Sequence, residues 1–153
     1  MEYRIVEKNP FKVLTKIEVF DIMDNKVPEF WDQCSKDGTF DILRNNTRIH
    51  DIFGLCSPTV RSTSYFDYGI GMLYEGGEIP EGFMIWEVKP TTWAVFNCYG
   101  ETGECVQEMW DKIANEEPFK NNYQRLSDTD FEFYSSCESD CFCEIWIPVK
   151  KIK

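Results

Sequence analysis

Glu144 is the residue whose neighbours point most clearly to chemistry. It lies in the segment Phe142-Cys143-Glu144-Ile145-Trp146, where strand alternation would put Phe142, Glu144 and Trp146 on one face. A carboxylate between two rings can pair with a cationic ligand while the rings add cation–π attraction. Enclosure among the rings could instead make it a proton donor or base. The competing interpretation is an exposed strand glutamate, the commonest fate of this residue type.

A tyrosine and a second glutamate are the next candidates. Tyr68, in a predicted strand of the first half of the chain, could face Glu144 across a groove and orient a ligand or join in proton transfer. Glu132 shares a strand face with Tyr134 and could add a second negative charge. Packing in the core or exposure to solvent explains each of these residues as well. The candidate walls of the groove are four aromatic residues, Trp86, Phe96, Tyr134 and Trp146.

Little in the sequence supports a metal site or a nucleophilic active site. Cys137, Cys141 and Cys143 have the spacing Cys-x3-Cys-x-Cys, which differs from the paired Cys-x2-Cys of zinc ribbons. His50 is the only histidine, and nothing in the sequence pairs it with a thiol. The glycines form no phosphate-binding loop. We therefore expect neither a metal nor a cofactor.

Composition narrows the function classes. The 153 residues carry a formal net charge of −11, so the surface would on average repel a nucleic-acid backbone and attract cations or basic partners. We expect no DNA-binding segment and no direct contact with nucleic acid. The chain opens without an apolar signal stretch and has no run near the ~20 apolar residues of a membrane span. The seven cysteines are then expected to be reduced, in a cytoplasm.

Hydrophobic periodicity predicts an alternation of strands and helices. A two-strand segment turned at Asn9-Pro10 covers residues 3–20, and a second pair of strands surrounds Lys89-Pro90. Apolar residues at spacings of three and four predict the two main helices. The predicted strands are 3–20, 52–56, 65–74, 83–88, 92–99, 130–135 and 142–150, and the predicted helices are 26–36, 104–115 and a short piece at 40–43.

An internal repeat suggests how these elements are arranged. Trp31 and Trp110 lie 79 residues apart, and the same offset relates Val27 to Val106. We interpret both tryptophans as core residues. Each half reads strand–helix–strand–strand, so we expect one α+β domain over residues 1–153 with halves at about 1–75 and 83–153. The two halves would be related by a pseudo-two-fold axis, with antiparallel sheets and a central groove for a ligand.

The ordered set of motifs resembles the gyrase-inhibitor-like (GyrI-like) effector-binding domain family. The strings that carry the resemblance, which together cover nearly the whole chain, are Phe30-Trp31, Phe66-Asp67-Tyr68-Gly69-Ile70-Gly71, Ile79-Pro80-Glu81-Gly82-Phe83, Trp93-Ala94-Val95-Phe96, Glu108-Met109-Trp110, Asp130-Phe131-Glu132-Phe133-Tyr134 and Glu144-Ile145-Trp146-Ile147-Pro148-Val149. The resemblance implies a duplicated fold with an aromatic cleft, and it implies that Glu144 is the acidic residue of that cleft.

The resemblance also implies three functions. Bacterial multidrug-responsive transcription regulators use this domain to bind cationic, aromatic compounds, so the first expectation is a stand-alone binder of a small aromatic or cationic molecule. The second is a hydrolase of strained cyclopropane-bearing toxins, with Glu144 as acid or base and Tyr68 as its partner. The third is a protein inhibitor of a topoisomerase, in which the acidic surface meets a basic protein partner.

Overall fold

The computed structural model describes residues 1–58, 64–89 and 91–152. Pro90, around which a pair of strands was predicted, lies outside the described residues. The described elements, in chain order, are β1 (Arg4–Lys8), β2 (Phe11–Asp21), α1 (Val27–Lys36), α2 (Thr39–Asn45), β3 (Ile52–Cys56), β4 (Tyr65–Leu73), β5 (Met84–Val88), β6 (Thr91–Cys98), α3 (Glu104–Glu116), β7 (Tyr123–Arg125), β8 (Asp130–Tyr134) and β9 (Cys143–Lys151).

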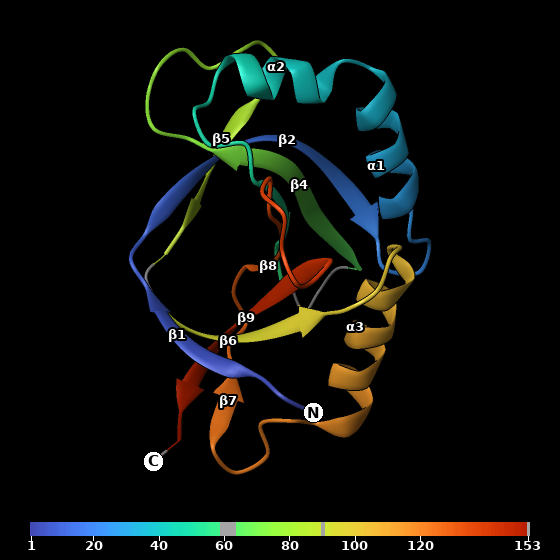
Figure 1. Ribbon diagram of the computed structural model, residues 1–153, viewed down its shortest axis with the longest axis vertical. Coiled ribbons are helices and arrows are strands. Elements are labelled where there is room, and N and C mark those ends of the chain that lie inside the picture. The colour runs from blue at the N-terminus through green and yellow to red at the C-terminus, as the bar shows by residue number, and fades with distance from the viewer. Residues whose placement is uncertain (59–63, 90, 153) are drawn as a thin grey trace.

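The strands form one antiparallel sheet with the order β1-β6-β9-β8-β3-β4-β2-β5, and β7 pairs with β9. Strands β2, β3 and β4 come from the first half of the chain and β6, β8 and β9 from the second, so β3 and β8 meet in the middle (Figure 1). Helices α1 and α3 lie on the same side of the sheet, one over each half. The fold is therefore the predicted α+β arrangement of two strand–helix–strand–strand units.

The pairing differs from the prediction at the sheet edges. Strands β1 and β2 do not pair with each other: β1 pairs with β6, and β2 pairs with β4 and β5. Likewise β5 pairs with β2, whereas β6 pairs with β1 and β9. Each end of the sheet thus takes a strand from the other half of the chain. The three-residue strand β7 was not predicted because it is too short to show a period.

Each main helix buries one apolar stripe. In α1 the buried residues are Phe30 and Cys34, one turn apart, and in α3 they are Val106 and Ile113, two turns apart. Pro28 fits the first turn of α1, where its missing N–H leaves no intrahelical bond unmade. These apolar residues pack each helix against its own half of the sheet. The space between the two helices lies above β3 and β8.

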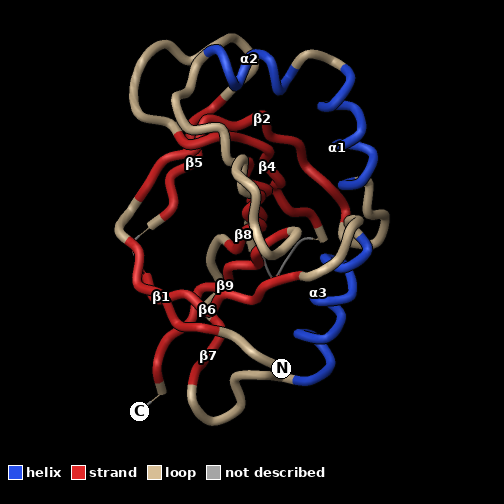
Figure 2. The backbone as a smooth tube through the Cα atoms, in the orientation of Figure 1, coloured by secondary structure: helices blue, strands red, loops and turns tan. Residues whose placement is uncertain are grey.

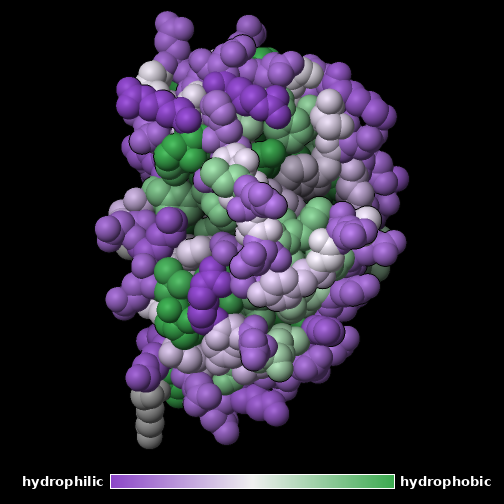
Figure 3. Space-filling model, in the orientation of Figure 1, coloured by the Kyte–Doolittle hydropathy of each residue, from purple (hydrophilic) through white to green (hydrophobic). Residues whose placement is uncertain are grey.

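The helix-free face of the sheet closes on itself. Residues from both ends of the sheet meet there: Phe11 of β2 and Trp93 of β6 both pack on Phe131 of β8, with ring centroids 5.7 and 5.0 Å apart. The curl of the backbone that allows this is visible in Figure 2. In the same view, hydrophilic side chains cover most of the molecular surface and hydrophobic groups show between them toward the middle (Figure 3). The aromatic core on the helix-free face thus packs against the central strands β3 and β8.

No helix within the described residues is both long enough and apolar enough to cross a membrane.

Candidate functional site

A cleft of about 870 Å³ lies between α1 and α3, above the central strands β3 and β8. Its size is within the range of clefts that hold drug-sized ligands. The cleft exists because the residues of β3 and β8 beneath it are small or polar, among them Gly54, Cys56 and Glu132. Its aromatic walls come from both halves of the chain and consist of Trp31, Phe66, Tyr68, Trp110, Tyr134 and Phe142.

Glu132 is the central charged group of the cleft. Its Oε2 accepts a hydrogen bond from Trp110 Nε1 at 2.8 Å, and its Oε1 accepts one from Tyr134 Oη at 2.7 Å. Burial raises the pKa of Glu132. The donors Tyr134 and Trp110, together with the nearby Tyr68 hydroxyl, act in the opposite direction by stabilising the ionised form. In the part of the chain that the structure describes, no ion pair includes Glu132.

Gly54 gives this arrangement its space. It lies directly opposite Glu132 in the pairing of β3 with β8. A Cβ at Gly54 would overlap Tyr68 Oη and lie 3.0 Å from Trp31 Cζ2, so only glycine lets both rings reach the centre. Trp31 Nε1 then donates to Tyr68 Oη at 3.0 Å. One tryptophan from each helix therefore points its N–H group into the cleft.

Both tyrosines of the cleft are held in the neutral form. Burial is the largest cause that raises the pKa of Tyr68 and of Tyr134, and the nearby Glu132 charge raises both further. A neutral phenol beside a carboxylate is a hydrogen-bond donor. The Glu132 carboxylate is thus surrounded by neutral donors and ring faces.

An internal ion pair closes one end of the cleft. Arg125 Nη2 lies 3.1 Å from Asp130 Oδ2, and the Arg125 guanidinium carbon lies 5.9 Å from the centre of the Trp110 ring. Burial raises the pKa of Asp130 to about 6, although the charge of Arg125 acts to lower it. Asp130 and Glu132 are two residues apart on β8, so their side chains lie on the same face of the sheet.

Three of the predicted site residues meet in the cleft: Tyr68, Glu132 and Tyr134. Glu132 was predicted only as a secondary charge, yet it is the carboxylate whose charge acts on Tyr68. The predicted pair of Tyr68 with Glu144 is not formed. These two residues lie on β4 and β9, which are separated by β3 and β8, and their side chains are on opposite faces.

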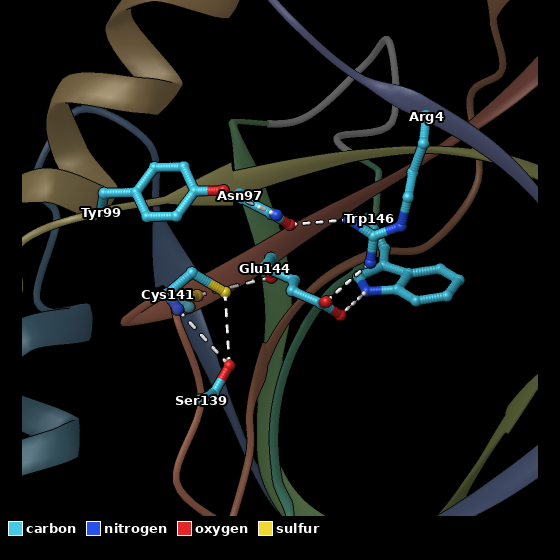
Figure 4. Close-up of polar contacts among 8 residues, drawn as sticks. Arg4, Asn97, Tyr99, Ser139, Cys141, Glu144 and Trp146 are labelled. Carbon is cyan, nitrogen blue, oxygen red and sulfur yellow. Dashed lines mark hydrogen bonds and ion pairs between the residues drawn. The ribbon is translucent and has the colours of Figure 1, made fainter.

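Glu144 belongs to a surface network behind the cleft. Its Oε2 is 2.7 Å from Arg4 Nη2, and its Oε1 accepts a hydrogen bond from Trp146 Nε1 at 3.0 Å (Figure 4). Arg4 also donates to Asn97 Oδ1 at 2.7 Å. The predicted alternation is correct from Cys143 onward, but the face assigned to the groove was wrong, and Phe142 lies in the cleft with Tyr134 rather than beside Glu144 and Trp146. The groove opens on the helix side, because the helices are separated above β3 and β8.

The remaining predicted walls pack elsewhere. Phe96 is fully buried beneath α3, in the core shared with Ile145. Trp146 stacks on Phe131 on the helix-free face, with centroids 5.3 Å apart. Trp86 lies on that face too, and its Nε1 donates to Thr129 at 3.2 Å. These three rings stabilise the sheet rather than line the cleft.

Trp31 and Trp110 are the residues that sequence reasoning misjudged, since both were assigned to the core. Each lies at the edge of its helix's apolar stripe, so that its ring reaches the cleft while Phe30 or Ile113 packs on the sheet. The 79-residue repeat was the available signal. It marks equivalent positions in the two halves, and the structure places both rings at the cleft between them.

The cysteines show no sign of a metal centre. All seven are free thiols. Over residues 1–58, 64–89 and 91–152, no group of three potential ligands among His, Cys, Asp and Glu is placed to hold a metal ion. Cys143 pairs in register with Cys98, and both are buried beneath α3.

The sequence matches one protein family, described as integron-associated effector-binding protein, over residues 4–149. That match covers nearly the whole chain. Among curated protein sequences, none matches this chain.

Solved structures share the fold over almost the whole chain. SAV2435, determined with bound tetraphenylphosphonium, superposes with a TM-score of 0.82 at 21% identity, covering 98% of this chain and 94% of that one. A Staphylococcus aureus protein described as a putative transcription regulator gives 0.79 at 21% identity, with 98% and 99% covered. An integron cassette protein of Vibrio cholerae gives 0.70 at 22% identity, with 97% and 95% covered. At these identities the likeness shows the fold.

Proposed function

Since this chain belongs to the family of integron-associated effector-binding proteins, we propose that it binds small lipophilic organic cations in the cleft between α1 and α3. The observation that carries the proposal is the Glu132 carboxylate, which accepts hydrogen bonds from Trp110 and Tyr134 on the cleft floor. Neutral donors stabilise a charge but do not balance it. A cation entering the cleft would supply the missing counter-charge.

The lining of the cleft favours a particular kind of cation. Trp31, Trp110 and Phe66 offer aromatic surfaces, which attract a positive charge through their negative faces. A compact ammonium ion is strongly hydrated, and the hydration free energy that it would lose on entering the cleft exceeds the attraction of the rings. An aromatic cation with a spread charge loses little hydration and buries apolar area. We therefore infer specificity for bulky, delocalised cations, and tolerance of several such compounds.

The likeness to SAV2435 supports this choice, because that protein holds tetraphenylphosphonium in the same fold. The GyrI-like resemblance supports it also, since multidrug-responsive regulators bind such compounds. On this proposal the chain sequesters the compound or reports it to a protein partner in the bacterial cytoplasm. The hydrolase alternative required a water between an acid and a phenol. Both oxygens of Glu132 instead accept hydrogen bonds from Tyr134 and Trp110, which favours binding.

Tetraphenylphosphonium and tetraphenylborate test the proposal, because they share a shape and carry opposite charges. For about 25 heavy atoms at roughly 0.3 kcal/mol each, we expect the phosphonium to bind with a Kd on the order of 10 µM. The borate should show no measurable binding. Isothermal titration calorimetry at pH 8 measures both.

Tetramethylammonium is the control for attraction to the acidic surface, since it has the charge but not the rings. It should not bind. Equal binding of phosphonium and borate, or binding of all cations alike with steep salt dependence, would contradict a specific cation site.

A further inference from the structure

A second carboxylate, that of Asp130, lies at the outer end of the cleft, and it is paired with the side chain of Arg125. Asp130 lies two residues before Glu132 on β8, on the same face. The Arg125 guanidinium sits beside Asp130 at 3.1 Å and over the Trp110 ring at 5.9 Å. Arg125, Asp130 and Trp110 all line the cleft. The Asp130 carboxylate and the Trp110 ring thus form a site that suits a planar cation.

The resident ion pair is easy to displace. Arg125 makes one short contact with Asp130, through Nη2, and its side chain is 45% exposed, whereas that of Asp130 is 17% exposed. Because the arginine is this exposed, solvent screens its attraction to the carboxylate. A better-placed cation could therefore take over the carboxylate.

There is room beyond the pair for a longer ligand. Cys56, Arg125 and Asp130 line both the cleft and an adjoining hollow of about 450 Å³, which continues past Ser57 and Leu126. The ion pair therefore lies where the two spaces adjoin. A molecule that contacts Glu132 and Asp130 together would displace Arg125 toward this hollow.

We propose that Asp130 is a second cation subsite, so that the cleft recognises organic dications whose planar charged groups lie roughly 6–7 Å apart, the spacing of alternate residues on a strand. Arg125 is the internal competitor for the outer position. This inference rests on the function proposed for Glu132 and adds the ligand class. Amidinium groups fit the site at Asp130 because, like a guanidinium, they are planar cations with two parallel N–H donors.

Benzamidine and benzene-1,4-diamidine test the inference, since they differ by one amidinium on the same ring. Their affinities are measured by calorimetry at pH 8, where Asp130, with a pKa of about 6, is ionised. Wild-type protein should bind the diamidine at least ~10-fold more tightly than benzamidine, beyond the two-fold expected from two equivalent ends. Asp130→Asn should reduce this ratio to about two.

Arg125→Gln distinguishes a competitor from a fixed part of the site. Removal of a competitor should tighten diamidine binding by ~3- to 10-fold. The inference is overturned if phosphonium binds but the diamidine has no advantage in wild-type protein, or if Arg125→Gln weakens diamidine binding. If phosphonium itself fails to bind, the failure lies with the proposed function at Glu132. The wild-type ratio and the Arg125 variant keep the test valid should Asp130→Asn fail to fold.

Discussion

Replacing Glu132 with glutamine is expected to weaken the binding of tetraphenylphosphonium by about 30- to 160-fold, which corresponds to about 2–3 kcal/mol. Loss of one partner of a buried ion pair costs ~3–5 kcal/mol, and the effect is smaller here because phenyl groups hold the phosphonium charge away from the carboxylate. The fold should survive. Glutamine keeps the shape, and the hydroxyl of Tyr134 can rotate to accept a bond from the new amide. Calorimetric titration of both proteins measures the difference.

Glu144→Gln is the matched control. It removes the same charge from a strand glutamate that lies behind the sheet, paired with Arg4 on the surface. Phosphonium affinity should stay within ~2-fold, because the lost charge is screened and distant from the cleft. If Glu144→Gln abolished binding and Glu132→Gln did not, the groove would be on the other face and the account of the site would be reversed.

A methyl group at Gly54 is expected to disrupt the cleft from its floor. The added Cβ of Gly54→Ala would overlap Tyr68 Oη and lie 3.2 Å from Tyr68 Cζ, on a side chain that is 5% exposed and has little freedom to move. Overpacking of this kind costs ~1–3 kcal/mol. Displacement of Tyr68 would also break the hydrogen bond that its hydroxyl accepts from Trp31 Nε1. Urea denaturation should show the loss of stability, and titration should show weaker phosphonium binding.

A double-mutant cycle identifies the cause. Tyr68→Phe removes the atom that the new methyl group overlaps most, so Gly54→Ala should cost less in the Tyr68→Phe background than in wild-type protein. Gly103→Ala is the control, since a Cβ there meets no atom within 4 Å. Strictly additive effects of the two substitutions would show that Gly54 does not act through Tyr68.

Burial of the two acids of the cleft, Asp130 and Glu132, makes the stability of the fold depend on pH. The pKa of Asp130 is about 6 in the folded chain and 3.8 in its reference state, and that of Glu132 is also raised. Between those values the folded chain holds more protons than the unfolded chain, so the free energy of unfolding falls as the pH rises through this range. A bound cation would remove this cost by favouring the ionised carboxylates.

Much of the fold could be predicted from the sequence, because strands and helices have distinct periods. The helix predicted at residues 104–115 forms as Glu104–Glu116, and the strand predicted at 52–56 forms with those bounds. Strand partners at the sheet edges could not be predicted. Neither Asn9-Pro10 nor Lys89-Pro90 carries the Asn-Gly or Asp-Gly signal that would fix a two-residue hairpin.

The site was predicted less well, because alternation along a strand does not say which face is open. Glu132 and Glu144 both lie among aromatic residues on neighbouring strands. Which of them meets the cleft depends on the gap between α1 and α3 and on the space left by Gly54, which are properties of the tertiary structure. The repeat showed that Trp31 and Trp110 are equivalent, but their place on either side of the gap is visible only in the tertiary structure.

The ionisation of Glu132, followed by carbon-detected nuclear magnetic resonance of a sample labelled at its glutamate carboxyl carbons, tests the central claim most directly. Comparison with Glu132→Gln assigns the signal. Without ligand the pKa should lie above the ordinary value of 4.5, and saturating tetraphenylphosphonium should lower it, because a bound cation favours the ionised form. A signal that titrates at the same pH with and without the phosphonium would contradict the claim that Glu132 is the counter-ion of the ligand.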